Sequence, residues 1–297
     1  MRTFTVLLAT NIVELLMLSY GLRCRADEML AQMRHPALLL REILLVAVGV
    51  PILMLVILHL VPMSGVAASI FMLFAICPAA PYVLRPFLKR KSAAVKALVV
   101  VSVGLLSSIV VIPIWVTILN RYFGFEFRVS IGEVVTLLLL KVFMPLVSGI
   151  LLRRGLKSRS EKAGRVLEAI VAVALVAATI LLVVEGAGSL RMFNLRIASA
   201  LLLVCTSSAA LGAIAGGRDP ELREILANAA MNGNPAIALA IIGASYPTLQ
   251  VAGLLAAYIL CRSIATYPYL LYTKYRALRR PETAANASPR SGRATNP

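Results

Sequence analysis

Residues 228–235 read Asn-Ala-Ala-Met-Asn-Gly-Asn-Pro and interrupt an apolar run that is otherwise long enough to cross a membrane. Proline lacks a backbone donor and its ring clashes with the preceding turn, so a helix breaks at Pro235. Hydrocarbon cannot satisfy the carbonyl groups that the break sets free. Such backbone survives at membrane depth only inside protein or beside a watery cavity. The stretch therefore predicts a discontinuous transmembrane helix.

A second stretch of the same kind lies five spans earlier. Residues 77–81 read Cys-Pro-Ala-Ala-Pro, and Pro86 follows them. A single proline would indicate only a kink, which is common in membrane helices. Two breaks in the third and eighth spans instead favour an inverted repeat of five helices that lacks the first helix of one copy. This plan is typical of secondary transporters, whose broken helices mark a substrate site near the middle of the membrane.

Nine apolar stretches surround and include the two breaks, and they predict an all-α protein of the lipid bilayer. With 60% hydrophobic residues among 297 and a mean hydropathy of +0.89, the chain has more apolar surface than one soluble core can hide. Most stretches can cross about 30 Å of hydrocarbon at about 1.5 Å per residue. The predicted spans are Thr3–Leu22, Leu38–Val61, Ser64–Leu88, Ala93–Leu119, Ile131–Leu152, Lys162–Glu185, Leu195–Ala215, Glu221–Ala244 and Thr248–Tyr272.

The basic residues predict how these spans are oriented. Lys and Arg gather in alternate loops, most densely at residues 153–165, and only the sixth and seventh loops tie. Because basic loops face the cytoplasm, we expect an inner-membrane protein with its N-terminus outside and its C-terminus inside. The same loops explain the net charge of +17. They lack interleaved aromatic residues for base stacking, so we expect no nucleic-acid partner.

The ends of the chain and its reactive residues add further expectations. The first span carries Asn11 and Glu14 and has no small-residue cleavage site before Arg23, which indicates a retained helix. We expect residues 1–280 to form one transmembrane domain and the polar residues 281–297 to form a disordered cytoplasmic tail. The four cysteines form no C-x-x-C pair and there are two histidines, so we expect no metal, no cofactor and no enzymatic activity.

Several motifs share the order and spacing of one known family. Gly21-Leu22 precedes Met33-Arg34-His35-Pro36, the two breaks follow, and Pro113 and Pro145 lie between them. They resemble the Gly-Leu turn, the Arg-x-Pro helix start, the Cys-Pro-Gly-Gly break, the E-x-G-x-Q-N-x-x-L-A break and the helix prolines of the bile acid:sodium symporter family. This resemblance extends over nearly the whole chain.

The resemblance implies two parts that move against each other. Spans 3–22, 131–152 and 162–185 would form a panel, and spans 38–61, 64–88, 93–119, 195–215, 221–244 and 248–272 would form a core. The broken helices would cross in the core, and substrate would bind between core and panel. Alternating access would follow from their relative movement, and the substrate would be a bile acid or another small organic anion.

The sodium site that the resemblance implies is degraded here. The family continues its first break with a Ser-Asn pair that ligates sodium, whereas this chain has Pro81-Tyr82-Val83-Leu84. The family's second break carries a glutamate, whereas Ala227 or Asn228 stands here. A hard cation needs several oxygen ligands, preferably with a carboxylate. We therefore expect the sodium dependence of the family to be altered.

One serine of that sodium site aligns with Lys96, which allows two interpretations. The ammonium could replace sodium as a tethered positive charge, and transport would then be coupled to protons or uncoupled. Alternatively, Lys96 lies near the cytoplasmic end of its span and reaches water. Arg41 and Glu42 stand at the start of another span, where we expect the membrane interface.

The remaining charges inside spans also allow two interpretations each. Arg262 would counter the charge of an anionic substrate, or it would form a structural ion pair with Glu14 or Glu133. Glu14 shares a face with Asn11 and would line the cavity or hold helices together. The candidate substrate- and ion-binding residues are Asn228, Asn232, Asn234, Pro235, Pro78, Pro81, Tyr82, Lys96, Arg262 and Glu14.

Two other functions stay open beside a secondary transporter of an organic anion. A membrane sensor or scaffold could keep the fold and lose transport. The missing sodium ligands favour that reading, and the helix breaks, which cost stability, disfavour it. An arsenite exporter would use the thiolate of Cys77, although the Cys-Pro motif of the resembled family explains this residue without arsenic. The substrate, the coupling ion and the oligomeric state are left undetermined by the sequence.

Overall fold

The structure is a computed structural model that describes residues 2–278 apart from short gaps. The gaps are residues 24–26, 28–30, 32–33, 35, 78–80, 88–89, 126, 128–129, 187–193, 236, 239–240 and 243–247. The predicted tail at residues 281–297 lies outside the described residues, as does Pro78 of the first break.

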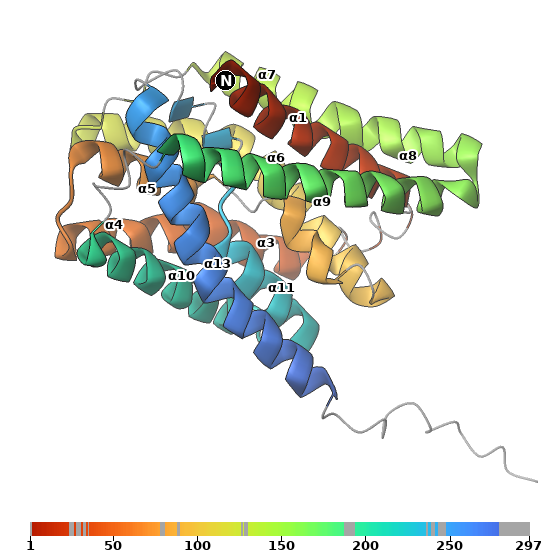
Figure 1. Cartoon of the computed structure of the whole chain (residues 1–297). Coiled ribbons are helices and arrows are strands. Elements are labelled where there is room, and N and C mark those ends of the chain that lie inside the picture. The colour runs from red at the N-terminus through yellow and green to blue at the C-terminus, as the bar shows by residue number, and fades with distance from the viewer. Residues whose placement is uncertain are drawn as a thin grey trace, which may run out of the picture.

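Every regular element of the described residues is a helix, which confirms the all-α prediction (Figure 1). Among the described residues, each of the nine predicted spans contains a helix. The helix of the eighth span ends at Met231, where the second break begins, and the ends of the others lie within a few residues of the prediction. Two helices contain a π-helical turn, and the third span continues after its break as a short 3-10 helix. The elements are α1 (Arg2–Arg23), α3 (Pro36–Leu44) with η1 (Leu45–Gly49) and α4 (Val50–Leu60), α5 (Gly65–Ile76), η2 (Pro81–Phe87), α6 (Lys91–Phe123), α7 (Ile131–Leu138) with η3 (Leu139–Phe143) and α8 (Met144–Leu156), α9 (Arg159–Gly186), α10 (Leu195–Ala215), α11 (Pro220–Met231) and α13 (Thr248–Leu278).

The surface of the helices suits lipid better than water. Within the described residues, Pro36–Leu60, Ser92–Phe123 and Leu195–Ala215 are each long and apolar enough to cross a membrane. Helix α5 is equally apolar but too short to cross, as expected for half of a broken span. Large side chains such as Leu195 and Ile214 are 86% and 74% exposed, and an apolar surface of this kind indicates contact with a membrane.

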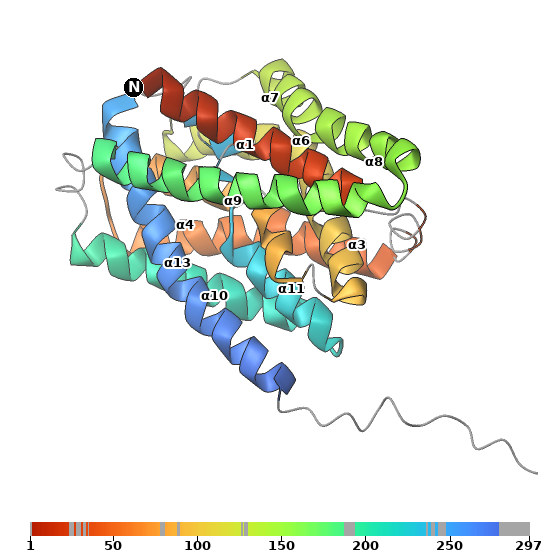
Figure 2. The same ribbon diagram turned by 45° about the vertical axis from the view of Figure 1, so that its right-hand side comes forward.

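Close backbone contacts hold two groups of helices together. Helix α1 packs along α8 and against α9, as both views show (Figures 1 and 2). A Cβ atom added to Gly21 would lie 2.3 Å from the carbonyl oxygen of Leu146, so the α1 and α8 backbones touch. Gly21 is therefore a packing residue inside α1, which corrects the expectation of a Gly-Leu turn. Helices α10 and α11 touch in the same way at Gly212.

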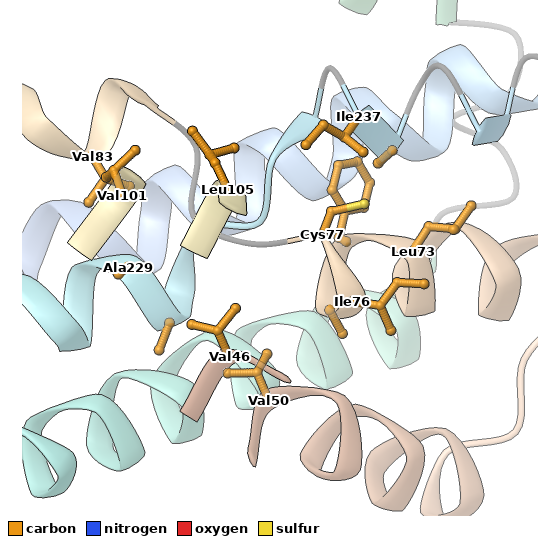
Figure 3. Close-up of a cluster of buried hydrophobic side chains, with 14 of the residues drawn as sticks. Val46, Val50, Leu73, Ile76, Cys77, Val83, Val101, Leu105, Ala229 and Ile237 are labelled. Carbon is orange, nitrogen blue, oxygen red and sulfur yellow. The ribbon is translucent and has the colours of Figure 1, made fainter. Parts of the chain in front are cut away.

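A core of apolar side chains surrounds the end of α5. Val46 of η1 and Val50 of α4 lie on one side, and Leu73, Ile76 and Cys77 come from α5 and its end (Figure 3). Side chains from both sides of the second break complete the cluster, where Figure 3 labels Ala229 and Ile237. This packing fixes the position of both helix breaks relative to α3–α4.

Candidate functional site

The two helix breaks touch each other. Helix α5 ends at Ile76, and Cys77 is extended with φ −87° and ψ 117°. The carbonyl oxygen of Cys77 accepts a hydrogen bond from the backbone N–H of Asn234 at 3.4 Å. Gly233 lies so close to α5 that an added Cβ would come within 2.1 Å of the carbonyl oxygen of Phe74. Only glycine fits at this crossing, and segments 157 residues apart in sequence meet backbone to backbone.

Three buried asparagines supply partners for the interrupted backbone. The side-chain amide of Asn228 donates to the carbonyl of Val83 in η2 at 3.3 Å. The amide of Asn232 donates to the backbone oxygen and the side-chain oxygen of Asn228 at 2.6 and 2.8 Å. Asn234 accepts from the N–H of Ile237 at 3.4 Å and so caps the turn that Pro235 begins. No water is available to the backbone inside hydrocarbon, so these side-chain amides supply the hydrogen bonds that the interrupted backbone needs.

A cavity of about 310 Å³ lies beside the crossing. It is open on one side and is lined by η2, the end of α11 and the middle of α13. The lining residues are Val83, Arg85, Pro86, Asn228, Asn232, Arg262, Ser263, Thr266 and Tyr267. Two of these side chains are guanidinium groups, the other polar ones are amides and hydroxyls, and none of these described lining residues is acidic. The cavity therefore offers donors and positive charge, which suits an anionic ligand.

Aromatic rings connect the cavity to the crossing. The ring of Tyr258 in α13 stacks on Phe74 of α5, with centroids 3.8 Å apart and planes 5° from parallel. The guanidinium carbon of Arg262 lies 6.0 Å from the centroid of Tyr258, at the edge of cation–π range. Tyr258 was not foreseen, because a tyrosine in an apolar span gives no signal of its contacts. Val83 was missed because it contributes only a carbonyl oxygen.

The predicted site residues separate into a cavity group and others. Asn228, Asn232 and Arg262 line the cavity, whereas Asn234 and Pro235 belong to the crossing behind it. Pro78 lies outside the described residues, and the side chains of Pro81 and Tyr82 in η2 are likewise not described. Lys96 and Glu14 lie elsewhere.

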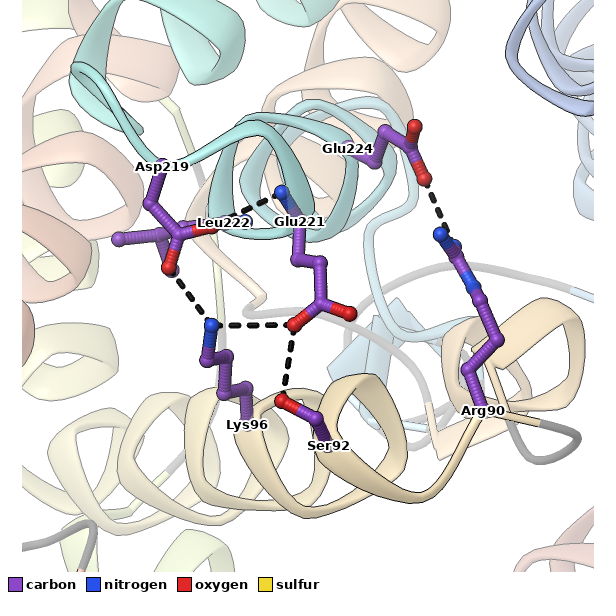
Figure 4. Close-up of polar contacts among 7 residues, drawn as sticks. All are labelled: Arg90, Ser92, Lys96, Asp219, Glu221, Leu222 and Glu224. Atoms are coloured by element: carbon purple, nitrogen blue, oxygen red, sulfur yellow. Dashed lines mark hydrogen bonds and ion pairs between the residues drawn. The ribbon is translucent and has the colours of Figure 1, made fainter. Parts of the chain in front are cut away.

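Lys96 joins the start of α6 to the start of α11. Its ammonium donates to the carboxylates of Asp219 at 2.7 Å and Glu221 at 3.0 Å (Figure 4). Two further contacts in the same figure, Arg90 to Glu224 and Ser92 to Glu221, extend this connection. Because Glu221 precedes Asn228 by about two helical turns, Lys96 is remote from the cavity. This position agrees with the interpretation that places Lys96 near the end of its span.

Asp219 also caps α11, and its ionisation reflects both roles. Its carboxylate accepts from the backbone N–H groups of Glu221 at 2.9 Å and Leu222 at 3.2 Å. Burial raises the pKa of Asp219, but the hydrogen bonds from Lys96 and from these amides outweigh burial and hold the pKa below its usual value. The charged form therefore stabilises the folded protein above about pH 4, and this contribution is lost as the pH falls through the lowered pKa.

Removing this cap should have a measurable cost. Asp219→Ala should lower the free energy of unfolding by about 1–2 kcal/mol, because an N-cap acceptor is lost. Asp219→Asn keeps an acceptor and should recover most of that loss, since a partly exposed ion pair contributes less. Thermal unfolding in detergent measures both. The gap between wild type and Asp219→Asn should shrink below about pH 4, and a gap independent of pH would contradict the role of the charge.

The other predicted charge, Glu14, holds two helices together. Its carboxylate accepts a hydrogen bond from Lys141, which lies in the π-helical turn η3. Glu133 instead forms a capping box with Ser130 at the start of α7. Neither carboxylate is therefore the partner of Arg262 that the sequence suggested. The pairing of Lys141 was missed because residues 127 positions apart meet only through the tertiary fold.

A charged bridge crosses from η2 to α1 and α9 beside the cavity. Glu168 of α9 lies 3.6 Å from Arg85, which lines the cavity, and it also accepts a hydrogen bond from Arg23 of α1. The hydroxyl of Tyr20 is buried nearby and has no hydrogen-bond partner among the described residues. Through Arg85 and Glu168 the cavity is thus connected to α1 and α9, whose described residues do not line it.

Comparison with known proteins identifies the family. The family model described as Sodium Bile acid symporter family matches residues 10–194, a stretch that contains the first break and ends before the second. Among curated proteins, none matches this chain. Members of the matched family are membrane transporters rather than enzymes. Because the match covers more than half of its length, this integral membrane protein belongs to the sodium bile acid symporter family.

Proposed function

We propose that the protein is a secondary transporter that carries a small organic anion by alternating access. Membership of the family suggests secondary transport. The observation that carries the finer proposal is the cavity beside the crossing, with Arg85 and Arg262 in its wall and no acidic group among its described lining residues. An ion of the opposite sign gains about 4 kcal/mol from a unit charge at about 4 Å where the effective dielectric constant is near 20.

The size of the cavity favours a compact anion. Its volume of about 310 Å³ lies at the lower end of the range of about 300–1,000 Å³ that is typical of small-molecule sites. A guanidinium group binds a carboxylate or a similar anion through two parallel hydrogen bonds. Amides at Asn228 and Asn232 and the hydroxyl of Ser263 add neutral donors. The substrate we propose is therefore a small organic carboxylate or a comparable anion.

Helix packing supports movement of two parts against each other. We assign α1, α7–α8 and α9 to a panel and the remaining helices, arranged as an inverted repeat, to a core. Helix α9 meets α13 across the boundary, and α1 meets η2. The pair between Arg85 and Glu168 bridges the same boundary. The basic loops place this bridge near the cytoplasm in the inner membrane, so it would open and close the inner entrance to the cavity.

The geometry of Asn228 favours transport without sodium. Its amide N–H points at the carbonyl of Val83, at the place where the resembled family would use a glutamate, a cation and the Ser-Asn pair. A direct amide–carbonyl hydrogen bond leaves no role for a bridging cation. The proposal therefore departs from sodium coupling.

Uptake by purified protein in proteoliposomes tests the function directly. We expect time-dependent uptake from a panel of small carboxylates and taurocholate, and saturation at high concentration. Empty liposomes and an excess of unlabelled probe are the controls. Absence of flux for every probe, with thermal stabilisation by one of them, would favour the sensor alternative and contradict the transporter.

Sodium should leave this uptake unchanged. Replacing sodium by potassium on both sides, with the membrane potential clamped, should alter the initial rate less than twofold, because the Asn228–Val83 hydrogen bond occupies the place of the cation. Asn228→Ala should slow uptake through loss of a buried hydrogen bond, worth about 1–3 kcal/mol, without creating a sodium requirement. A rate that falls tenfold or more without sodium would contradict the proposal.

A further inference from the structure

Glu42 is a fully buried acidic side chain in a membrane helix. It lies in α3, within the membrane-spanning stretch Pro36–Leu60, and its exposed fraction is 0%. By strict hydrogen-bond geometry both carboxylate oxygens lack a partner among the described residues, although the backbone of Gly104 in α6 lies close enough to interact with the carboxylate. The sequence led us to expect this residue at the membrane interface, and the structure adds that its side chain faces the protein interior.

No charged side chain of the described residues on the helices around Glu42 forms an ion pair with it. Helix α3 packs against α6, where Lys96 is held by two carboxylates and Arg121 lies at the far end over the ring of Tyr122. Its continuation η1 carries no ionisable side chain and packs also against α5 and α10. On α10, Arg196 lies in the first turn and the buried Cys205 is neutral. The adjacent Arg41 is exposed and approaches Gly217 beyond α10.

An isolated carboxylate cannot stay ionised in such a place. Moving an unpaired charged carboxylate out of water costs far more than a folded protein can tolerate, so the group takes up a proton instead. A metal cation is a poor occupant, because it needs several ligands and the described residues contain no group of three or more His, Cys, Asp or Glu side chains that could hold one. The ligand that fits Glu42 is therefore a single proton.

The position of Glu42 links this proton to the helix breaks. Three residues after it, the helix passes into the π-helical turn η1, a feature that is frequent at functional sites. Val46 of η1 packs in the cluster that surrounds the end of α5 and the second break (Figure 3). A change in the charge of Glu42 therefore acts on the same packed unit that positions the cavity.

We propose that Glu42 is the proton-binding site that couples transport to the proton gradient. This inference rests on the proposed transport function. The carboxyl group binds one proton while it is buried as seen here, and it releases that proton to the opposite side when the other conformation admits water. One proton thus crosses with each substrate anion, which makes the transport of a monovalent anion electrically neutral.

The proton site can be tested without any substrate. Infrared spectra of the purified protein in lipid at neutral pH should contain the carbonyl stretch of a protonated carboxyl group, shifted in heavy water. Glu42→Gln has the shape of the neutral form, so it should fold normally and lose this band. The matched control Glu133→Gln changes an exposed carboxylate and should keep it. A wild type without the band, or a Glu42→Gln protein that retains it, would overturn the proton site.

Coupling requires a second measurement in proteoliposomes, with labelled pyruvate, a small monovalent carboxylate, as the probe. An inward gradient of one pH unit should drive about tenfold accumulation in the wild type at one proton per anion. Glu42→Gln should lose this accumulation and keep exchange of labelled for unlabelled probe. Accumulation that persists in Glu42→Gln would refute the coupling role. A wild type that moves no pyruvate would refute transport of this small carboxylate and the coupling role with it, whereas the infrared result would still decide whether Glu42 holds a proton.

Discussion

Replacing Gly233 by alanine should deprive the protein of most of its thermal stability and of transport. The added Cβ would lie 2.1 Å from the oxygen and 2.9 Å from the carbon of the Phe74 carbonyl. Both atoms belong to backbone, so no side chain can move aside. The two breaks would have to separate and lose the hydrogen bond between Asn234 and Cys77. Overpacking and a lost buried hydrogen bond together should cost about 3 kcal/mol or more.

A glycine of the other broken span, on helix α5 that Gly233 contacts, provides the control. Gly65 begins α5, and a Cβ added there would have no atom within 4 Å. Gly65→Ala should therefore unfold at the wild-type temperature and transport at the wild-type rate. Thermal unfolding in detergent and the monodisperse fraction after purification compare the variants. A Gly233→Ala protein as stable as Gly65→Ala would show that the crossing is not the rigid centre described here.

The sequence identified the breaks because their causes are local. Proline and glycine act on the backbone of their own turn, so Pro235 and Gly233 announce the interruption without tertiary information. Buried polar residues beside a break also have a local reason to be there, which is why Asn228 and Asn232 were found. Arg262 was found because a charge deep in an apolar span demands an explanation. Asn228, Asn232 and Arg262 all line the cavity.

The contacts that the sequence did not predict depend on which side of each helix faces the neighbouring helices. Position along a span gives the depth of Glu42 but not the side of the helix on which it lies, and the fold turns that side toward the protein interior. The π-helical turns η1 and η3 also change the direction of the residues that follow, and no residue pattern announced them. The contacts of Lys96 were equally hard to predict. Its alignment with the resembled family suggested the sodium site, whereas in the fold its ammonium donates a hydrogen bond to Asp219.

Replacing Arg262 by alanine should reduce anion uptake by about tenfold to a hundredfold with the fold intact. A charge-assisted hydrogen bond contributes about 1.5–3 kcal/mol, and the guanidinium lies in the wall of the cavity. The initial uptake rate in proteoliposomes measures the effect, and thermal unfolding in detergent reports the fold. Stability should not fall, since removing a charge from a membrane span relieves a cost of insertion.

Comparison with the second guanidinium in the cavity shows why Arg262 should matter more. Arg85 shares its charge with Glu168 at 3.6 Å, so Arg85→Ala should weaken uptake less and should also loosen the bridge to α1 and α9. Arg262→Lys keeps the charge but lacks the planar fork, so it should restore only part of the rate. Arg121→Ala, at the far end of α6, is the control for loss of a positive charge. If Arg262→Ala instead unfolds while Arg85→Ala abolishes uptake, the anion binds at η2 and Arg262 has a structural role.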